Sequence, residues 1–185
     1  DMEARRGEVP EIAEGENVIV TMSEDGHPTA FRLTLHATDA DLDGLTWSIP
    51  ENRSAQHGAA VLTEATGDLV QVGYVPNPDF NGDDAFTVVV IDSRGGSDEI
   101  VVSVVIEAVN DAPVITEGAN VEVTLSEDGQ PDSFELTLHA TDVDGDALTW
   151  SIPDTGAASH GQATAGSTGL ESELSYVPVV DYHGT

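Results

Sequence analysis

The chain contains no cysteine and no lysine. Without cysteine it has no disulfide bond, no thiolate nucleophile and no zinc–thiolate site. Five arginines oppose 35 aspartates and glutamates among 185 residues, which gives a formal net charge of −30 at pH 7. A field of that sign repels nucleic-acid phosphates and anionic membrane surfaces, so neither is expected as a partner. Divalent cations are the expected counterions.

Long hydrophobic runs are missing too. No apolar stretch approaches the roughly 20 residues that a membrane-spanning helix needs, and residues 1–10 contain no apolar signal core. We therefore expect a soluble protein with no membrane insertion. Because position 1 is not Met, we also expect the chain to be an internal piece of a longer protein.

What the sequence does contain is a repeat. Asn17–Pro50 matches Asn120–Pro153 without a gap, at an offset of 103 residues. Farther along, "HGAA" from His57 matches "HGQA" from His160. We predict an N-terminal extension at 1–9, repeat 1 at 10–109, a linker at 110–113 and an incomplete repeat 2 at 114–185. The linker contains a proline and should be an extended connection.

Within a repeat, hydrophobic residues recur at every second position, as they do in half-buried strands. In residues 31–38, Phe, Leu and Ala alternate with Arg, Thr and His. The other predicted strands are 18–22, 45–49, 59–63, 69–75, 85–91 and 99–108. Seven strands in about 100 residues, with a Trp on the third, indicate an all-β fold with an immunoglobulin-like β-sandwich in each repeat.

Repeat 2 ends at Thr185, before the counterparts of the last two strands of repeat 1. A sandwich without those strands exposes apolar inner faces and an unpaired edge. We favour a fragment or processing boundary as the reason. The alternative, completion of the sandwich by a partner chain, predicts a dimer in solution.

Two acidic loops, "DADLD" from Asp39 and "DVDGD" from Asp142, each place three carboxylates at alternate positions. Like charges at this spacing repel one another unless a cation lies between them. In an antiparallel seven-strand order, the loops after the first, third and fifth strands share one end of the domain with the chain exit. Glu24, residues 78–84 and the linker should therefore meet the second acidic loop at the junction. Such a site suits a hard cation with about six to eight oxygen ligands.

The acidic loops also invite two simpler interpretations, a solvated turn and an EF-hand. Asp-rich turns cap strands and solvate loops, which is a sufficient reason for any single aspartate. An EF-hand is excluded because position twelve of the loop is Pro50 in one copy and Pro153 in the other, and a strand follows where a helix is required.

The segments "SEDG", "LHATDADLDGLTWSI" and "VNDAP" resemble a cadherin repeat, in particular the bacterial cadherin-like tandem repeats of large secreted or surface adhesins of the RTX type. The resemblance implies tandem cadherin-like β-sandwiches with calcium at the junction between repeats. Its ligands would be Glu24, Asp79, Asn81, Asn110, Asp111, Asp142 and Asp144, with Asp146 added from the second acidic loop. Asp39, Asp41 and Asp92 would face a preceding domain. Because Ala108 stands where animal cadherins have an acidic residue, we expect one or two ions and not three.

These features predict a calcium-binding repeat that the ion stiffens, with a weak affinity of about 10⁻⁴ to 10⁻³ M suited to the extracellular medium. The chain would be an extender or adhesive segment of a large bacterial cell-surface or secreted protein, mediating cell adhesion. Its expected partners are calcium ions, neighbouring repeats of the same polypeptide, and a homophilic or glycan partner.

The alternative prediction is a carbohydrate-binding module attached to a polysaccharide-degrading enzyme. It needs exposed aromatic side chains, yet the chain has only nine aromatic residues. Most of them alternate in step with the apolar residues of a strand and are therefore expected to face the core. A protein-binding receptor ectodomain also stays open. No nucleophile elbow, phosphate-binding loop or histidine metal pair is present, so no enzymatic activity is expected.

Overall fold

The computed structural model describes residues 7–127, 132–154 and 157–184. The chain divides into two compact units, Asp1–Val109 (unit 1) and Asn110–Thr185 (unit 2). Of the predicted N-terminal extension, residues 1–6 lie outside the described residues.

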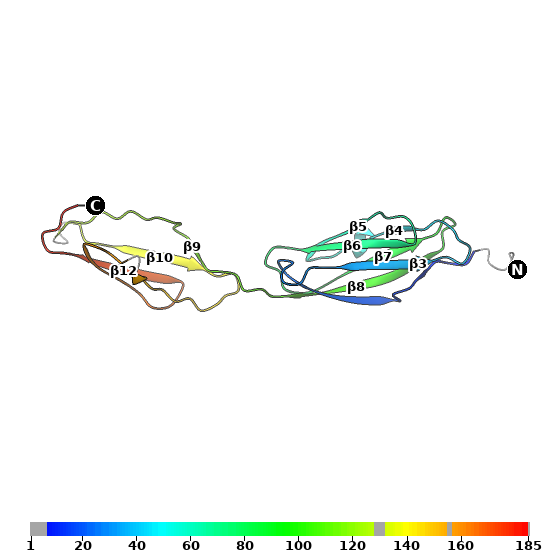
Figure 1. Ribbon diagram of the computed structural model, residues 1–185, viewed down its shortest axis with the longest axis horizontal. Helices are drawn as coiled ribbons and strands as arrows, with labels where there is room; N and C mark the ends of the chain where they lie inside the picture. The colour runs from blue at the N-terminus through cyan, green and yellow to red at the C-terminus, as the bar shows by residue number, and fades with distance from the viewer. Residues whose placement is uncertain (1–6, 128–131, 155–156, 185) are drawn as a thin grey trace. The chain divides into compact units, whose positions relative to one another are not determined.

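Unit 1 is a sandwich of two four-stranded sheets with the orders β1-β3-β6-β5 and β2-β8-β7-β4 (Figure 1). Its strands are β1 (Glu11–Ile12), β2 (Asn17–Ser23), β3 (Leu33–Thr38), β4 (Thr46–Ser48), β5 (Gly58–Thr63), β6 (Leu69–Pro76), β7 (Gly82–Ile91) and β8 (Ser97–Glu107). A 3-10 turn at Glu51–Arg53 follows β4. The predicted all-β, immunoglobulin-like fold is confirmed.

The seven predicted strands of repeat 1 are all present, with ends within three residues of the predicted ones. The strand that the sequence did not reveal is β1, which pairs with β3 through only two residues. Two residues are too few to show an alternating pattern. The first strand of the fold is therefore split, with β1 in one sheet and β2 in the other.

The second sheet contains a parallel pair. Strand β2 runs parallel to β8 from the pair Asn17 and Val101 to the pair Ser23 and Glu107. Strands that run parallel end at the same edge of a sheet. The loop after β2 therefore lies beside the end of β8, where the chain leaves unit 1.

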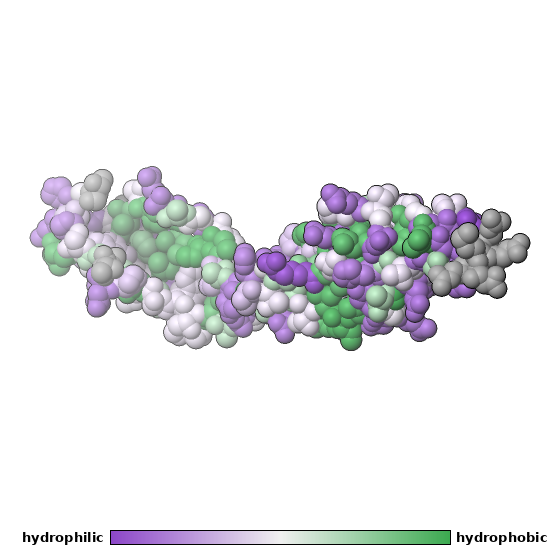
Figure 2. All heavy atoms as spheres, turned by 45° about the vertical axis from the view of Figure 1, so that its right-hand side comes forward, coloured by the Kyte–Doolittle hydropathy of each residue, from purple (hydrophilic) through white to green (hydrophobic). Residues whose placement is uncertain are grey.

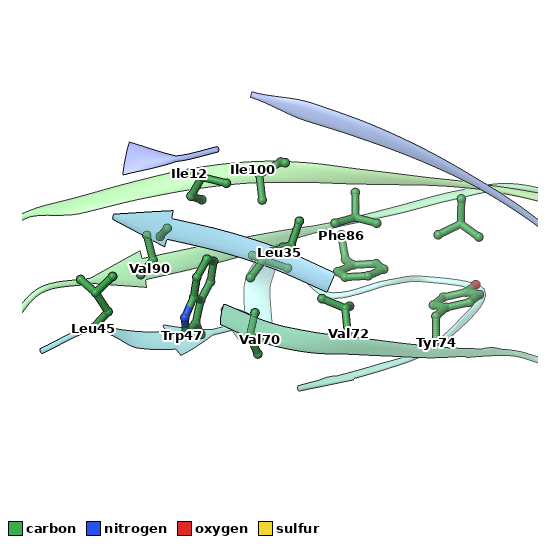
Figure 3. Close-up of a cluster of buried hydrophobic side chains, with 14 of the residues drawn as sticks. Ile12, Leu35, Leu45, Trp47, Val70, Val72, Tyr74, Phe86, Val90 and Ile100 are labelled. Atoms are coloured by element: carbon green, nitrogen blue, oxygen red, sulfur yellow. The ribbon is translucent and has the colours of Figure 1, made fainter. Parts of the chain in front are cut away.

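The core of unit 1 lies between the two sheets, because buried and exposed residues alternate along each strand. In β8, Ile100, Val102 and Val104 are at most 1% exposed. Figure 3 shows side chains from both sheets, among them Leu35 and Trp47, pointing into the space between them. The polar atom of the buried Trp47 ring is satisfied, since its Nε1 donates to the Gly67 carbonyl at 2.8 Å.

Asp84 is a buried polar residue that fixes the turn before β5. Its carboxylate accepts the backbone N–H groups of Gln56 and His57, at 3.1 and 2.8 Å, and the hydroxyl of Tyr74 at 2.8 Å. Burial raises the pKa of Asp84, but these hydrogen bonds outweigh burial and leave the pKa below its ordinary value. Burial and the neighbouring carboxylate raise the pKa of Tyr74.

Unit 2 contains β9 (Val114–Ile115), β10 (Leu136–Thr141), β11 (Gly161–Ala165) and β12 (Glu171–Pro178) in one sheet of order β11-β12-β10-β9. This order repeats the β5-β6-β3-β1 sheet of unit 1. The hydrogen bond of the tryptophan recurs as well, because Trp150 Nε1 donates to the Gly169 carbonyl at 2.8 Å.

Unit 2 is less completely buried than unit 1. Among its described residues there is no counterpart of β7 or β8, and 120–126, which correspond to β2, form no strand. Leu138 and Tyr176 are half-buried, whereas the equivalent residues of unit 1, Leu35 and Tyr74, are 0% and 5% exposed. Figure 2 shows hydrophobic surface on unit 2.

A glutamate–histidine contact ties the segment after the first strand of each unit to the strand that pairs with it, β3 in unit 1 and β10 in unit 2. In unit 1, Glu14 Oε2 accepts the His36 N–H at 3.0 Å, and Glu14 Oε1 lies 2.8 Å from His36 Nδ1. Glu117 and His139 repeat the contact in unit 2, at 2.7 Å from Oε1 to Nδ1. The backbone N–H and then the ring of His139 lower the pKa of Glu117 from 4.5 to about 2. For Glu14, burial raises the pKa, but the bonds from His36 outweigh burial and lower it.

Leu35→Ala should lower the free energy of unfolding of unit 1 by about 2–5 kcal/mol, because truncating a fully buried leucine leaves a cavity. The matched control is Leu138→Ala, the same position in the more exposed unit 2, for which we expect a smaller loss. Urea unfolding followed by tryptophan fluorescence measures both, with Trp150→Phe isolating unit 1 and Trp47→Phe isolating unit 2. Equal losses at the two positions would contradict the difference in burial.

Glu117 should titrate near pH 2 in a carbon-13 NMR titration of its carboxylate. Because this folded-state pKa lies below the ordinary 4.5, the contact stabilises the folded chain above about pH 4.5. That stabilisation is lost as the pH falls toward 2. His139→Ala should raise the pKa of Glu117, since the ring contact is removed while the backbone donor stays. A pKa near 4.5 in the unmodified chain would refute the prediction.

Candidate metal centre

Loop 1, Asp39–Asp43, joins β3 to β4 and carries the first acidic motif. One carboxylate oxygen from each of Asp39, Asp41 and Asp43 lies within 4.8 Å of the other two. The turn forms because Asp39 Oδ1 accepts the backbone N–H groups of Asp41, at 2.8 Å, and of Asp43, at 3.1 Å. Asp39 therefore stabilises the turn, as the simpler interpretation of an Asp-rich loop predicts, but it does so with only one of its two carboxylate oxygens.

Two buried oxygens of loop 1, Asp39 Oδ2 and Asp43 Oδ2, have no hydrogen-bond donor among the described residues, and only that of Asp39 also lacks an ion pair. Asp39 is 8% exposed, and its Oδ2 has no hydrogen-bond partner in the described part of the chain. Leaving a buried acceptor unsatisfied costs about 1–3 kcal/mol, and more when the group is charged. Asp39 lines a pocket of about 240 Å³ together with Thr38, Leu42, Asp43 and Asp68. A cation bound there would supply the missing partner.

The second aspartate of each loop holds the backbone of the chain that enters the unit. Asp41 Oδ2 accepts the N–H groups of Gly7 and Glu8, at 2.8 and 3.3 Å. In unit 2, Asp144 Oδ2 accepts the N–H of Asp111 at 2.7 Å. Glu8 and Asp111 are equivalent positions of the repeat, so the same anchor is built twice.

The third aspartate of loop 1 contacts the β7–β8 hairpin. Asp43 Oδ1 accepts the hydroxyl of Ser93 at 3.1 Å, and Asp43 Oδ2 lies 2.9 Å from Arg94 Nε. Asp43 Oδ1 is therefore hydrogen-bonded, whereas Asp43 Oδ2 has an ion pair with Arg94 but no hydrogen bond from the described residues.

Loop 2, Asp142–Asp146, joins β10 to the segment that contains Trp150. One carboxylate oxygen from each of Asp142, Asp144 and Asp146 lies within 4.8 Å of the other two. Asp142 Oδ1 accepts the Asp146 N–H at 3.1 Å, which repeats the turn of loop 1. Loop 2 is more open, because Asp142 is half-buried and the other two aspartates are exposed.

Glu24 lies at the exit end of unit 1, as the strand order predicted. It is 6% exposed, and its Oε1 accepts the Val109 N–H at 2.6 Å. The amide of Asn81 donates to Glu24 Oε2 at 3.5 Å. Asp79, two residues earlier, is exposed, has a left-handed φ of 57° and belongs to none of the carboxylate clusters of the described residues.

The remaining predicted ligands have local roles. Asn110 is exposed, and its side-chain amide donates to the Asp111 carbonyl at 2.8 Å. Asp92 is 6% exposed, and its Oδ1 accepts the N–H groups of Arg94 and Gly96, both at 2.8 Å. Asp92 thus closes the β7–β8 hairpin. That the ligands of the two units share ions at the junction stays a prediction.

Three groups in unit 1 were missed by the sequence argument. Asp43 was not chosen although Asp146, its equivalent in the repeat, was; the repeat alone was enough to find it. Ser93 and Arg94 reach Asp43 from a hairpin about 50 residues away in sequence, and no local pattern reveals that contact.

The chemistry available at both loops is that of oxygen donors. Each loop offers carboxylates without a cysteine or histidine in its cluster, which favours a hard cation such as Ca²⁺ over zinc or copper. The arrangement can bind a cation and stabilise a turn.

Both units also match a known family. The family of bacterial Ig domains matches residues 8–105 and 110–185. The chain belongs to the bacterial Ig domain family. The cadherin-like resemblance is thereby supported at the level of an Ig-like repeat, and membership of an RTX-type adhesin stays a prediction. No curated protein matches these bacterial Ig domains at a significant level.

Several solved structures are similar to this pair of bacterial Ig domains. One is an endo-fucoidan hydrolase of glycoside hydrolase family 107, at 20% identity over 92% of this chain and 24% of that one, with a TM-score of 0.45. Extracellular cadherin domains 1–5 of protocadherin gamma B2 match at 19% identity over 93% and 33%, with a TM-score of 0.48. The human desmocollin-1 ectodomain matches at 20% identity over 95% and 32%, with a TM-score of 0.44. The chain thus spans a quarter to a third of the length of these proteins.

Within the described ranges, no helix of this bacterial Ig domain pair has the length and hydrophobicity needed to span a membrane.

Asp144→Ala should speed amide hydrogen exchange at Asp111, because the N–H of Asp111 loses its carboxylate acceptor. The net strength of such a bond, roughly 0.5–1.5 kcal/mol, predicts an increase of about two- to tenfold without metal. Asp41→Ala should act in the same way on Glu8 and leave Asp111 unchanged, so each variant is the control of the other. Hydrogen–deuterium exchange followed by NMR measures both, and an unchanged Asp111 rate in Asp144→Ala would disprove the anchor.

Proposed function

We propose that this pair of bacterial Ig domains is a calcium-binding, adhesion-type repeat segment of a larger extracellular protein. The observation that carries the proposal is the buried Oδ2 of Asp39, which has no partner within the described residues. It belongs to a cluster of three carboxylates whose oxygens lie within 4.8 Å. A cation satisfies the buried oxygen and cancels the repulsion within the cluster at the same time.

Calcium fits the donor set better than other common ions do. It takes about six to eight oxygen ligands in flexible geometry, including carboxylates, backbone carbonyls and water. Extracellular modules of this type bind with dissociation constants of about 10⁻⁴ to 10⁻³ M. Such an affinity is useful only where calcium is millimolar, and bacterial Ig domains are typically extracellular.

The proposed effect of the ion is to restrain the residues that connect the two units. Glu24 holds the N–H of Val109, and Asp144 holds the N–H of Asp111, so only Asn110 lies between two anchored residues. Calcium at loop 2 would keep Asp144 in its anchoring position by relieving its repulsion from Asp142 and Asp146. A restrained connection is what an extender or adhesive repeat in a tandem array requires.

Neighbouring repeats of the same polypeptide and a homophilic or glycan ligand are the proposed partners. A carbohydrate-binding role has less support, since a sugar platform needs exposed aromatic rings. Trp47 is 2% exposed, and the indole N–H groups of Trp47 and Trp150 are both bonded to backbone carbonyls.

Isothermal titration calorimetry with calcium chloride tests the proposal on the full chain. Asp39→Asn with Asp41→Asn should remove or strongly weaken binding at loop 1, and Asp142→Asn with Asp144→Asn should do so at loop 2. Free calcium at about ten times the dissociation constant should stabilise the unmodified chain by about 1.4 kcal/mol.

The charge-matched control is Glu171→Gln with Glu173→Gln, which removes two charges from β12 outside both loops. This control should bind calcium as the unmodified chain does. Spin labels on the two units should show a narrower distance distribution with calcium than with EGTA. If millimolar calcium gives neither heat nor stabilisation, the proposed function is wrong.

A further inference from the structure

Loop 1 borders a pocket that another turn of unit 1 also lines. The pocket has a volume of about 240 Å³, and its lining includes Asp39 and Asp43 of loop 1 together with Asp68 of the β5–β6 turn, residues 64–68. Asp39 Oδ2 and Asp43 Oδ2 are both buried without a hydrogen-bond donor among the described residues. Buried acceptors are ordinarily satisfied, so two such oxygens at one pocket indicate that a ligand belongs there.

Backbone hydrogen bonds hold the β5–β6 turn against both ends of loop 1. Before the loop, the N–H of Ala37 donates to the Asp68 carbonyl at 2.8 Å, which continues the pairing of β3 with β6. After the loop, the N–H of Gly67 donates to the Leu45 carbonyl at 3.0 Å. The fold therefore keeps Asp68 beside loop 1, although it comes from a different turn of the chain.

The β5–β6 turn does not need the carboxylate of Asp68 for its own structure. In unit 2, the turn between β11 and β12 has Leu170 at the equivalent position, and Leu170 is 65% exposed. The N–H of Ala140 donates to the Leu170 carbonyl at 2.8 Å, and the N–H of Gly169 donates to the Leu148 carbonyl at 3.1 Å. Both backbone contacts thus recur with a leucine in place of the aspartate, so the turn gives no structural reason for an acid.

We propose that Asp68 is a further cation-binding residue of the loop 1 site, so that calcium is held between loop 1 and the β5–β6 turn, inside unit 1. The inference rests on the proposed function, because it concerns where the same ion binds. Asp39 and Asp43 supply their buried oxygens. Asp68 is exposed and lies outside the cluster of three carboxylates. It reaches the ion by rotation of its side chain or through a water molecule, as one position of the EF-hand loop often does.

The charge at this place favours a divalent cation. The three carboxylates of loop 1 and that of Asp68 face one guanidinium, which gives the group a formal charge of −3. Arg94 Nε lies 2.9 Å from Asp43 Oδ2 but donates no hydrogen bond to it, and Arg94 is not among the residues that line the pocket. The arginine therefore balances part of the charge and leaves the buried oxygens without donors.

Asp68→Asn tests the inference in an Asp142→Asn, Asp144→Asn background, in which the remaining calcium binding is that of loop 1. Removing one negative charge about 5 Å from a divalent ion should weaken binding about tenfold, even at the dielectric constant of water. Isothermal titration calorimetry measures the affinity. Without calcium, the variant should melt no lower than its background, because fewer like charges then repel one another.

The matched control is Glu64→Gln in the same background. Glu64 is an exposed carboxylate on the same turn, but it does not line the pocket. This variant removes the same charge and should change the calcium affinity less than about threefold, since solvent and salt screen exposed charges.

A second measurement needs no variant at position 68. In a calcium titration of the unmodified chain followed by carbon-13 NMR, the carboxylate resonance of Asp68 should shift in step with those of Asp39 and Asp43, whereas that of Glu64 should stay in place.

The outcomes separate the two proposals. Unchanged affinity in Asp68→Asn, or equal weakening in Asp68→Asn and Glu64→Gln, refutes the role of Asp68 and leaves calcium binding intact. A resonance of Asp68 that stays in place while that of Asp39 shifts refutes it too. If calcium gives no heat and shifts no carboxylate resonance in the unmodified chain, the proposed function fails and this inference fails with it.

Discussion

Carboxylates at alternate positions of a short loop repel one another. In both units, hydrogen bonds from backbone N–H groups to these carboxylates keep them close together. The first aspartate of each loop binds an amide of its own turn, as Asp39 does with Asp43 and Asp142 does with Asp146. The second aspartate binds the chain that enters the unit. Each amide offsets only part of the repulsion, because its charge is partial. The loops are thus formed in advance, with negative charge still uncompensated.

The uncompensated negative charge makes both loops suited to binding a cation. A carboxylate such as Asp39, which is buried with one oxygen lacking a donor, is unfavourable in a structural turn and favourable in a site for a cation. At loop 1, Arg94 of the β7–β8 hairpin places a positive charge 2.9 Å from Asp43 Oδ2.

The fold was open to prediction because its signals are local and occur twice. Alternation in 31–38, the tryptophan of β4 and the repeat offset were sufficient for the strands and for the end at which Glu24 lies. Contacts between distant segments were not open to prediction. The pairing of Asp43 with Arg94, the burial of Asp84 against Tyr74 and the short strand β1 depend on the three-dimensional packing of unit 1. Asp43 is an exception, because it is the repeat equivalent of Asp146 and could have been predicted as a ligand from the sequence.

The parallel register of β2 and β8 bears on how unit 1 responds to tension. The chain enters β2 at Asn17 and leaves β8 at Glu107, and the two strands are paired over seven residues each. Pulling on the two ends of the unit slides one strand along the other in shear, so the hydrogen bonds of the ladder must yield together and cannot open one after another. Backbone pairing of β2 with β8 thus gives the domain a direct resistance to tension.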